Sequence, residues 1–593
     1  MFVSFSASLG RYLAPAIGLL MITLMANADA ATFNVVSTVD EEDATPGDGV
    51  CATTAGACTL RAAVTESNAL AGPDVVNVAA GTYTLASASL SISNDVSIIG
   101  ASADTTLVDG AGLYRVFEVF SSGRTISFQA LTIQNGSVDA TVVGGGFYNQ
   151  GTNTISFTDV VVQNNRAGDG GGIYNAAGNV SLLRTTVRNN TASDPAATAP
   201  AYRLGGGVFN STGTLTLRNS TISGNTATIA GGLFNLGTAT IESSTISGNT
   251  ATNSGFVLNG GQGGGGIVNG SGSSATLVVN NSTISGNHAA GQHGGLYNWN
   301  GIVRLHNVTL TGNSAVGSAS GFAVSSINPG TVVYLRNTIV AANPTPGSRG
   351  DCENFGTSDR VVSVGYTLIG NNYSCAMTGS IGDQVGTDIA PINPALAALA
   401  SNGGDTQTHA LQPGSPAIDA GNPAGCASGI ATFTTDQRGQ QRVVDGGGGT
   451  ARCDLGAYEL ALPLANAGPD RAVYVGEAVT LDGSASSDSD GSIVSYSWVQ
   501  TSGTAVTLSA ADTATPNFTA PNSATTLTFR LTVTDNNNAV ASDVVTVVVN
   551  AVPVDSGGGG GGGCTMARSS GDHTLPILLL FAAAALWRRR REG

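Results

Sequence analysis

Apolar and polar residues alternate in short runs through most of the chain, and the runs recur. Residues 214–217 read Thr-Leu-Thr-Leu and residues 238–241 read Thr-Ala-Thr-Ile. Such a period of two turns one face of a strand inward. Glycine-rich units of the type Gly-Gly-Gly-x-x-Asn alternate with units reading Ser-Thr-Ile-Ser-Gly-Asn. The final Asn of these second units recurs after 24 residues, from Asn225 to Asn249, and after 26 residues, from Asn287 to Asn313.

A period near 25 that holds three short strands predicts one coil of a right-handed parallel β-helix, spanning residues 89–345. Glycine permits the positive φ of sharp corners, and Asn can bond to the same amide one coil away. We therefore expect ladders of Ile, aromatic and Asn residues along the axis. The isoleucines expected to point inward are Ile173, Ile222, Ile246, Ile267 and Ile284. A leucine-rich solenoid would need an LxxLxL frame, which is absent, and the density of Gly and β-branched residues excludes a helical solenoid.

Residues 465–550 differ in character and predict a small β-sandwich, so the expected fold class is all-β throughout. The order of strand-like segments resembles a PKD-type immunoglobulin-like domain, in which Trp498 would be the buried pin. Asp488 and Asp490 share a loop and are candidate Ca²⁺ ligands. A solvated acidic loop is the alternative interpretation.

Two segments flank the repeats. The first, Cys58-Thr59-Leu60-Arg61-Ala62-Ala63, resembles the CSLREA-type segment of bacterial surface β-helix proteins, from which Thr59 and Ala62 depart. It predicts an N-terminal cap over residues 31–88, with a short helix at 59–70 plugging the first coil. The second comprises residues 402–406, 414–421, 435–439 and 453–459, which resemble the C-terminal module of the choice-of-anchor family. It predicts a closing module over residues 346–460. These resemblances imply pectin-lyase-like architecture and a location at the cell surface. They do not imply an established activity.

Seven cysteines are present, and six of them fall into sequence-local pairs. We expect three disulfides in an exported chain: Cys51–Cys58, Cys352–Cys375 and Cys426–Cys453. Six cysteines allow 15 connectivities, so locality is the only warrant for this choice. Zinc would need four converging Cys or His ligands, and the sequence has no CxxC or HxxxH spacing.

The N-terminal 30 residues predict a secretory signal peptide. An apolar run, Leu13 to Ala26, follows Arg11, and the small residues Ala28 and Ala30 suit a signal peptidase. A retained N-terminal membrane helix is the alternative, although the run is shorter than the roughly 20 residues that a span needs.

Residues 551–593 predict a sorting tail. Seven glycines end at Gly563, Cys564 follows, and an apolar stretch over 575–587 precedes four arginines. This order resembles the GlyGly-type and Gly-Cys-type tails of Gram-negative bacteria, which implies cleavage by an intramembrane sorting protease and transfer to the cell surface. The arginines that would hold the end in the cytoplasm are Arg588, Arg589, Arg590 and Arg591. A simple single-span membrane anchor is the alternative.

The charge of the chain limits its partners. The formal net charge is −16, and all 23 basic residues are Arg. An acidic body argues against nucleic acid, because phosphate binding needs a basic face. A surface glycan or polymer is the expected partner.

Catalytic residues are not assigned by the sequence. A β-helix glycosidase needs paired carboxylates, and Asp159, Asp169 and Glu242 share no repeat position. His288 and His293 lie in glycine-rich corners and are expected to face solvent, without forming a metal pair. Asp436 and Arg438 suit an ion pair that closes the last coil.

The expected function is therefore that of an exported cell-surface structural or adhesive protein without a cofactor. A β-helix polysaccharide lyase or glycoside hydrolase is the alternative. An autotransporter passenger would need a C-terminal membrane barrel of alternating strands, and the sequence lacks that pattern.

Overall fold

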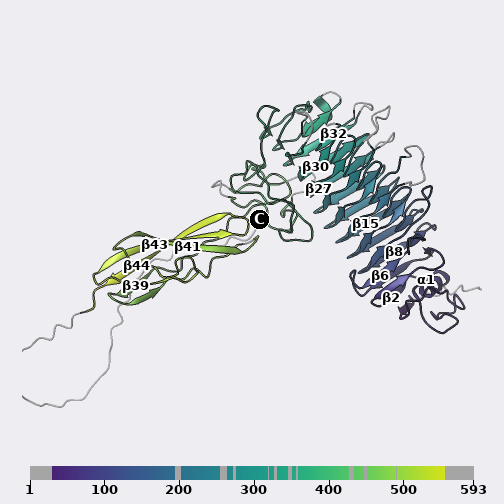
Figure 1. The fold of residues 1–593 in the computed structure, drawn as a ribbon, viewed down its shortest axis with the longest axis horizontal. Coiled ribbons are helices and arrows are strands. Elements are labelled where there is room, and N and C mark those ends of the chain that lie inside the picture. The colour runs from purple at the N-terminus through teal and green to yellow at the C-terminus, as the bar shows by residue number, and fades with distance from the viewer. Residues whose placement is uncertain are drawn as a thin grey trace, which may run out of the picture.

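Figure 1 shows the computed structural model of the chain, a long solenoid of strands followed by a smaller β domain. The structure describes residues 30–193, 202–253, 263–270, 275–317, 320–325, 330–344, 350–355, 358–426, 433–446, 451–488 and 490–553. The predicted signal peptide, apart from Ala30, and the sorting tail from residue 554 onward lie outside the described residues. Among the described residues, no helix is long and apolar enough to cross a membrane.

A central coil consists of four short strands. In one coil these are β11 (Thr154–Thr158), β12 (Val161–Gln163), β13 (Arg166–Ala167) and β14 (Ile173–Asn175). The next coil repeats them as β15 (Asn179–Leu183), β16 (Thr186–Arg188), β17 (Thr191–Ala192) and β18 (Val208–Asn210). Each strand pairs in parallel with its equivalent one coil later. The prediction of a parallel β-helix is confirmed.

The strands form three sheets along the axis, as three strands a coil would. One difference is that the first strand is divided in most coils, where residues such as Asp159 take a positive φ of 56° and bend it. In β27 (Ala275–Ser285) and β30 (Gly301–Thr311) the strand continues through the bend. Both halves of the divided strand belong to one 22-stranded sheet, which we call the bent sheet. Its other strands are β1 (Thr32–Val35), β2 (Asp74–Val78), β3 (Gly81–Thr84), β5 (Val96–Gly100), β6 (Thr106–Asp109), β8 (Thr125–Gln129), β9 (Thr132–Gln134), β19 (Thr214–Arg218), β20 (Thr221–Ser223), β23 (Thr238–Glu242), β24 (Thr245–Ser247), β27 (Ala275–Ser285), β30 (Gly301–Thr311), β33 (Val332–Arg336), β34 (Ile339–Val340), β36 (Val361–Ser363), β37 (Leu368–Ile369) and β38 (Gln384–Val385).

The other two sheets are narrower. The ten-stranded layer, called the aromatic sheet, holds β14 and β18 together with β4 (Leu90–Ser91), β7 (Phe117–Val119), β10 (Phe147–Asn149), β22 (Leu233–Asn235), β26 (Ile267–Asn269), β29 (Leu296–Asn298), β32 (Phe322–Val324) and β35 (Cys352–Asn354). The six-stranded layer holds β13 and β17 together with β21 (Thr226–Ala227), β25 (Thr250–Ala251), β28 (His288–Ala289) and β31 (Ser314–Ala315). A short 3₁₀ helix, Ser358–Arg360, precedes β36.

The helix α1 (Leu60–Ala69) covers the first coil, as predicted for residues 59–70. The side chain of Thr59 caps it by accepting a hydrogen bond from the Ala62 amide at 3.0 Å. Leu60 and Val64 join the core of the solenoid. The coils begin earlier than the cap predicted over 31–88 implies, because β1 already pairs with β2.

Apolar side chains at repeated positions fill the interior. The five isoleucines predicted to point inward are all fully buried. Each such burial contributes roughly 1.5–3 kcal/mol. Phe128 and Phe157 occupy neighbouring coils and stack at 5.0 Å between ring centroids. The predicted ladders therefore exist, and they set the register of the solenoid.

Asparagine ladders hold the corners. In the first, each side-chain Nδ2 donates to the Oδ1 of the residue one coil later, as from Asn225 to Asn249 at 2.9 Å. Its members are Asn165, Asn190, Asn225, Asn249, Asn287, Asn313 and Asn343. A second ladder connects Asn149, Asn175, Asn210, Asn235, Asn269 and Asn298. Buried amides paired in this way are fully satisfied, which favours one register over the alternatives.

The Gly-Gly-Gly units serve two physical purposes. The first glycine takes a positive φ, for example 59° at Gly170 and 65° at Gly205. The second has no room for a side chain, because a Cβ at Gly171 or Gly206 would lie 2.5 Å or less from the backbone of the neighbouring chain segment. Only the first purpose follows from the corner conformation that the sequence predicts.

The closing module does not simply end the solenoid. After β38 the chain runs back along the outside of the bent sheet. Gln437 donates from Nε2 to Thr245 at 2.9 Å, and Ser285 lies 2.7 Å from His409. Asn219 donates to Asp405 at 2.7 Å. The module therefore covers the outer side of the Ser-Thr-Ile-Ser strands.

The C-terminal domain is a β-sandwich. One sheet has the order β39 (Arg471–Tyr474), β44 (Val540–Asn550), β43 (Thr525–Asp535) and β41 (Ile493–Ser502), and the other pairs β40 (Ala478–Thr480) with β42 (Asn517–Thr519). Trp498 is buried between them, as predicted.

Candidate functional site

Aromatic side chains form a row on the outer face of the aromatic sheet, opposite to the core. They occupy the middle position of the three-residue strands, directly before the ladder asparagines. Tyr148, Tyr174, Phe209 and Phe234 are register partners in four successive coils. Their ring centroids are separated by 5.7, 4.7 and 5.3 Å along the row. Phe120 extends it at the N-terminal end, 5.7 Å from Tyr148.

Access to this outer aromatic row differs between its ends. Phe209 and Phe234 are buried, with Leu204 and Leu236 among the residues packed beside them. Tyr148 and Tyr174 are half-buried, and Phe120 is 52% exposed. The N-terminal end is therefore an open aromatic surface. Burial raises the pKa of both Tyr148 and Tyr174, so their hydroxyl groups stay protonated and can donate hydrogen bonds.

Arg115 packs against the ring of Tyr148 at the open end of the row. The Arg115 guanidinium lies 4.9 Å from the ring centroid of Tyr148 and pairs with Glu118. It also donates to the carbonyl oxygens of Gly144 and Val143, at 2.9 and 2.8 Å. Beside it lies a hollow of about 380 Å³, lined by residues that include Ser87, Leu113, Tyr114, Arg115, Asp139 and Val142. Fixed rings beside a polar hollow suit ligands with apolar faces and hydroxyl edges.

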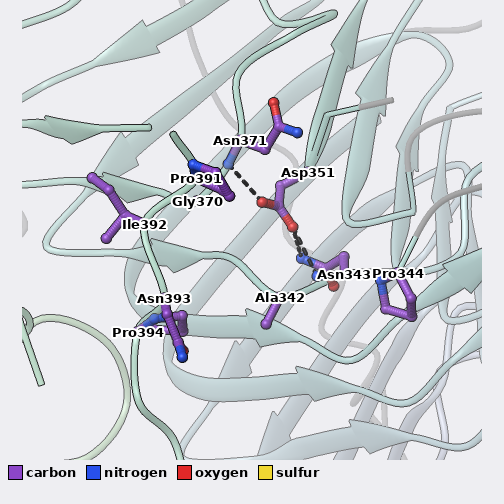
Figure 2. A pocket seen from close by; sticks show the side chains of 10 residues that line it. All are labelled: Ala342, Asn343, Pro344, Asp351, Gly370, Asn371, Pro391, Ile392, Asn393 and Pro394. Carbon is purple, nitrogen blue, oxygen red and sulfur yellow. Dashed lines mark hydrogen bonds between the residues drawn. The ribbon is translucent and has the colours of Figure 1, made fainter. Parts of the chain in front are cut away.

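A second hollow, of about 460 Å³, lies where the first asparagine ladder ends (Figure 2). Asp351 replaces the next asparagine there. One carboxylate oxygen accepts from Asn343 at 2.8 and 3.0 Å, and the other from the Asn371 amide at 2.7 Å. Each member of the ladder donates a hydrogen bond to the next member. The terminal residue therefore has only to accept hydrogen bonds, and a carboxylate does this. Burial raises the pKa of Asp351. This carboxyl group terminates the ladder and is committed to that structural contact.

Asp436 and Arg438 form the predicted ion pair, at 2.7 Å with neither side chain exposed. The same guanidinium lies 3.5 Å over the Tyr458 ring and 3.2 Å from Asp490 of the β-sandwich. Attraction to Asp436, Tyr458 and Asp490 outweighs the opposing effect of burial and raises the pKa of Arg438. The pair therefore joins the closing module to the next domain, a role that the sequence did not indicate for Asp490.

The calcium candidates lie at this junction. One oxygen each of Asp488, Asp490 and Asp535 is buried without a hydrogen-bond partner. Burial, followed by the proximity of Asp490, raises the pKa of Asp488 to about 7. Within the described residues, no three His, Cys, Asp or Glu side chains form a group that could hold a metal ion. Calcium binding by Asp488 and Asp490 stays a prediction.

The three local disulfides are present, with Cα separations of 5.0, 5.3 and 5.9 Å. The expectation for His293 is wrong, since its ring is buried and stacks 4.5 Å from Tyr297. Burial lowers the pKa of His293 to about 3. Asp159 and Glu242 are ion-paired with Arg184 and Arg218, at 2.7 and 3.1 Å.

Comparison with known families and structures identifies one part of the chain. Residues 467–549 match a family described as a PKD domain, so this segment is a PKD-like domain. The solution structure of the PKD domain from KIAA 1837 protein is similar at 37% identity, covering 16% of this chain and 92% of that one, with a TM-score of 0.14. No curated protein matches the chain.

Two other solved structures are similar. A nucleoside hydrolase-related hypothetical protein from Saccharophagus degradans, described as associated with carbohydrate metabolism, shares 25% identity over 15% of this chain, with a TM-score of 0.14. The match spans only 26% of that protein's length. The crystal structure of pectate lyase Pel9A shares 16% identity, with a TM-score of 0.40, and the match covers 73% of this chain and 98% of that one.

Proposed function

We propose that this chain is an exported cell-surface protein whose β-helix binds a polymer or surface glycan through the open end of the outer aromatic row. The observation that carries the proposal is that exposed Phe120 and half-buried Tyr148 and Tyr174 lie in one row on a hydrogen-bonded sheet. Pyranose rings have apolar faces that can lie against aromatic rings, while their hydroxyl groups reach polar neighbours such as Arg115 and Glu118. Rings held by strand pairing lose little freedom on binding.

In this proposal, the remaining parts of the chain place the β-helix at the cell surface. The PKD-like domain is a spacer, coupled to the closing module by the Asp436–Arg438–Asp490 contact. The tail, with Cys564 as its candidate processing point, delivers the body to the outer surface through an intramembrane sorting protease. Three disulfides support export, because such bonds persist in oxidising compartments.

Binding of the full-length exported protein to a panel of immobilised neutral polysaccharides tests the proposal. The variants Tyr148→Ala and Tyr174→Ala should each weaken retention about tenfold or more, because truncating a central aromatic contact costs roughly 2 kcal/mol. Tyr373→Ala is the matched control, since Tyr373 is 62% exposed and lies outside the row. Retention that is equal in all three variants would overturn the assignment of the row.

Reducing-end release measured on the same polymers separates the binding protein from the alternative lyase or glycosidase. Release that depends on the protein supports an enzyme. Retention without release supports the structural and adhesive function.

A further inference from the structure

Four side chains form a block on the outer face of the bent sheet in its late coils. Arg304 and His306 lie on β30, and Tyr334 and Arg336 lie directly opposite them on β33. All four point outward because the residues between them, Val303, Leu305, Val333 and Leu335, are fully buried. We call this group the basic block. It lies on a different sheet from the outer aromatic row.

The two arginines of the basic block differ from Arg184 and Arg218, which lie on the outside of earlier coils. Arg184 and Arg218 each pair with a carboxylate, at 2.7 and 3.1 Å. Arg304 and Arg336 have no carboxylate partner within the described residues, although the whole chain carries a net charge of −16. Arg336 Nε is buried without a hydrogen-bond partner. Two uncompensated guanidinium groups therefore lie together on a protein that is otherwise acidic.

The neighbouring groups leave this positive charge in place. The Arg304 guanidinium lies 5.4 Å from the centroid of the Tyr334 ring, which restrains it without neutralising it. His306 Nδ1 lies 3.0 Å from the side-chain oxygen of Asn280. Burial, with help from Arg336 and Arg304, lowers the pKa of His306 to about 4. The imidazole is thus neutral at pH 7, and the two arginines carry the charge.

We propose that the basic block binds an acidic sugar of an anionic polysaccharide. Guanidinium groups bind carboxylate and sulfate oxygens through paired N–H donors. The Tyr334 ring beside them offers an apolar face for the sugar ring itself. The shared chemistry is an oxyanion on a sugar, supplied by a carboxylate or a sulfate. This inference goes beyond the proposed function, because it names a second site and a charged class of ligand.

Retention of the full-length protein on polygalacturonate tests this site, with fully methyl-esterified polygalacturonate as the uncharged form of the same backbone. The double variant Arg304→Gln, Arg336→Gln should weaken binding to the acid form at least tenfold. Arg530→Gln is the matched control, because Arg530 is exposed on β43 of the PKD-like domain. Binding by the wild type should weaken with salt, which screens exposed charges. A parallel arm with dextran sulfate and dextran identifies sulfate as the anion.

Equal binding of the wild type and the double variant, or equal binding of the acid and its ester, would overturn the proposal if dextran sulfate also gives no charge-dependent difference. Unchanged thermal unfolding of the double variant excludes a folding defect. Failure of the outer aromatic row is distinguishable, since Tyr148→Ala and Tyr174→Ala leave the basic block intact and are tested on neutral polymers.

Discussion

Replacing Asn225 by Ala removes one rung of the first asparagine ladder and should loosen the coils on either side. Asn225 is fully buried. Its Oδ1 accepts from the amide and the side chain of Asn190, at 2.9 and 3.0 Å. Its Nδ2 donates to the Val187 carbonyl oxygen and to Asn249, both at 2.9 Å. The substitution therefore deletes four hydrogen bonds at a site that water does not reach.

The size of the effect follows from this count. A buried hydrogen bond contributes about 1 kcal/mol net, so the loss amounts to about 4 kcal/mol. Because each coil contacts only its neighbours, the cost falls on local opening more than on unfolding of the whole solenoid. A free energy of about 4 kcal/mol corresponds to a roughly 1,000-fold fall in protection of backbone amides against hydrogen exchange.

Hydrogen exchange of peptides covering residues 186–191 and 221–227 measures this effect. Thr214→Ala is the control, because Thr214 is exposed on β19 of the same coil and its loss should change stability by about 0.5 kcal/mol at most. Asn225→Asp should be at least as damaging at neutral pH, since it replaces the donor with a charged acceptor. Exchange that is as slow in Asn225→Ala as in Thr214→Ala would refute the view that the ladder holds the coils together.

Three further predictions concern pH, redox state and processing. The pKa of Asp488 in the folded protein is raised to about 7, so the stability of the PKD-like domain should fall as pH rises from 4 to 7, by roughly 1–2 kcal/mol after allowance for solvent screening. Asp488→Asn should flatten this pH profile of stability in denaturant titrations. A profile that the substitution leaves unchanged would contradict the assignment. Non-reducing peptide mapping should find only the three local disulfides, and reduction should lower stability by about 3 kcal/mol per short loop, judged by denaturant midpoints; a cross-linked pair such as Cys58–Cys352 would disagree with the locality argument. Intact mass of surface-extracted protein should end near Gly563 or Cys564, because an apolar segment of 13 residues spans only about 20 Å as a helix; recovery of the full sequence through Gly593 would mean that the segment is a membrane anchor.

The regular part of the fold could be predicted because each coil repeats the same local physics. Alternation assigned Ile246 and its equivalents to the interior, and the recurring Asn assigned the corners. The helix α1 was predicted from the resemblance of its segment to a known one, and the structure adds the cap at Thr59. The outer aromatic row was also visible in the sequence, as the residue before Asn149, Asn175, Asn210 and Asn235 of the second ladder. Alternation alone, however, does not say which outward-facing residues stay accessible.

The irregular part could not be predicted, because its contacts join residues that are far apart in the sequence. Gln437 donates a hydrogen bond to Thr245, which lies 192 positions earlier in the sequence. No pattern in the sequence of the closing module indicates that contact. Burial of His293 depends on its stacking against Tyr297 outside the core. Similarly, the Arg438–Asp490 contact depends on how two domains meet, which the sequence of neither domain specifies.

Hydroxyl-radical footprinting of the polymer-bound protein tests the central claim, that a glycan occupies the outer aromatic row. Phe120 and Tyr148 react readily when exposed, and a bound polymer should slow their oxidation severalfold relative to the free protein. Tyr373, which lies outside the row, should react at the same rate in both states. Protection of Phe120 and Tyr148 alone is the predicted result. If the polymer is retained while both rings are oxidised at their free rates, the row is not the binding surface.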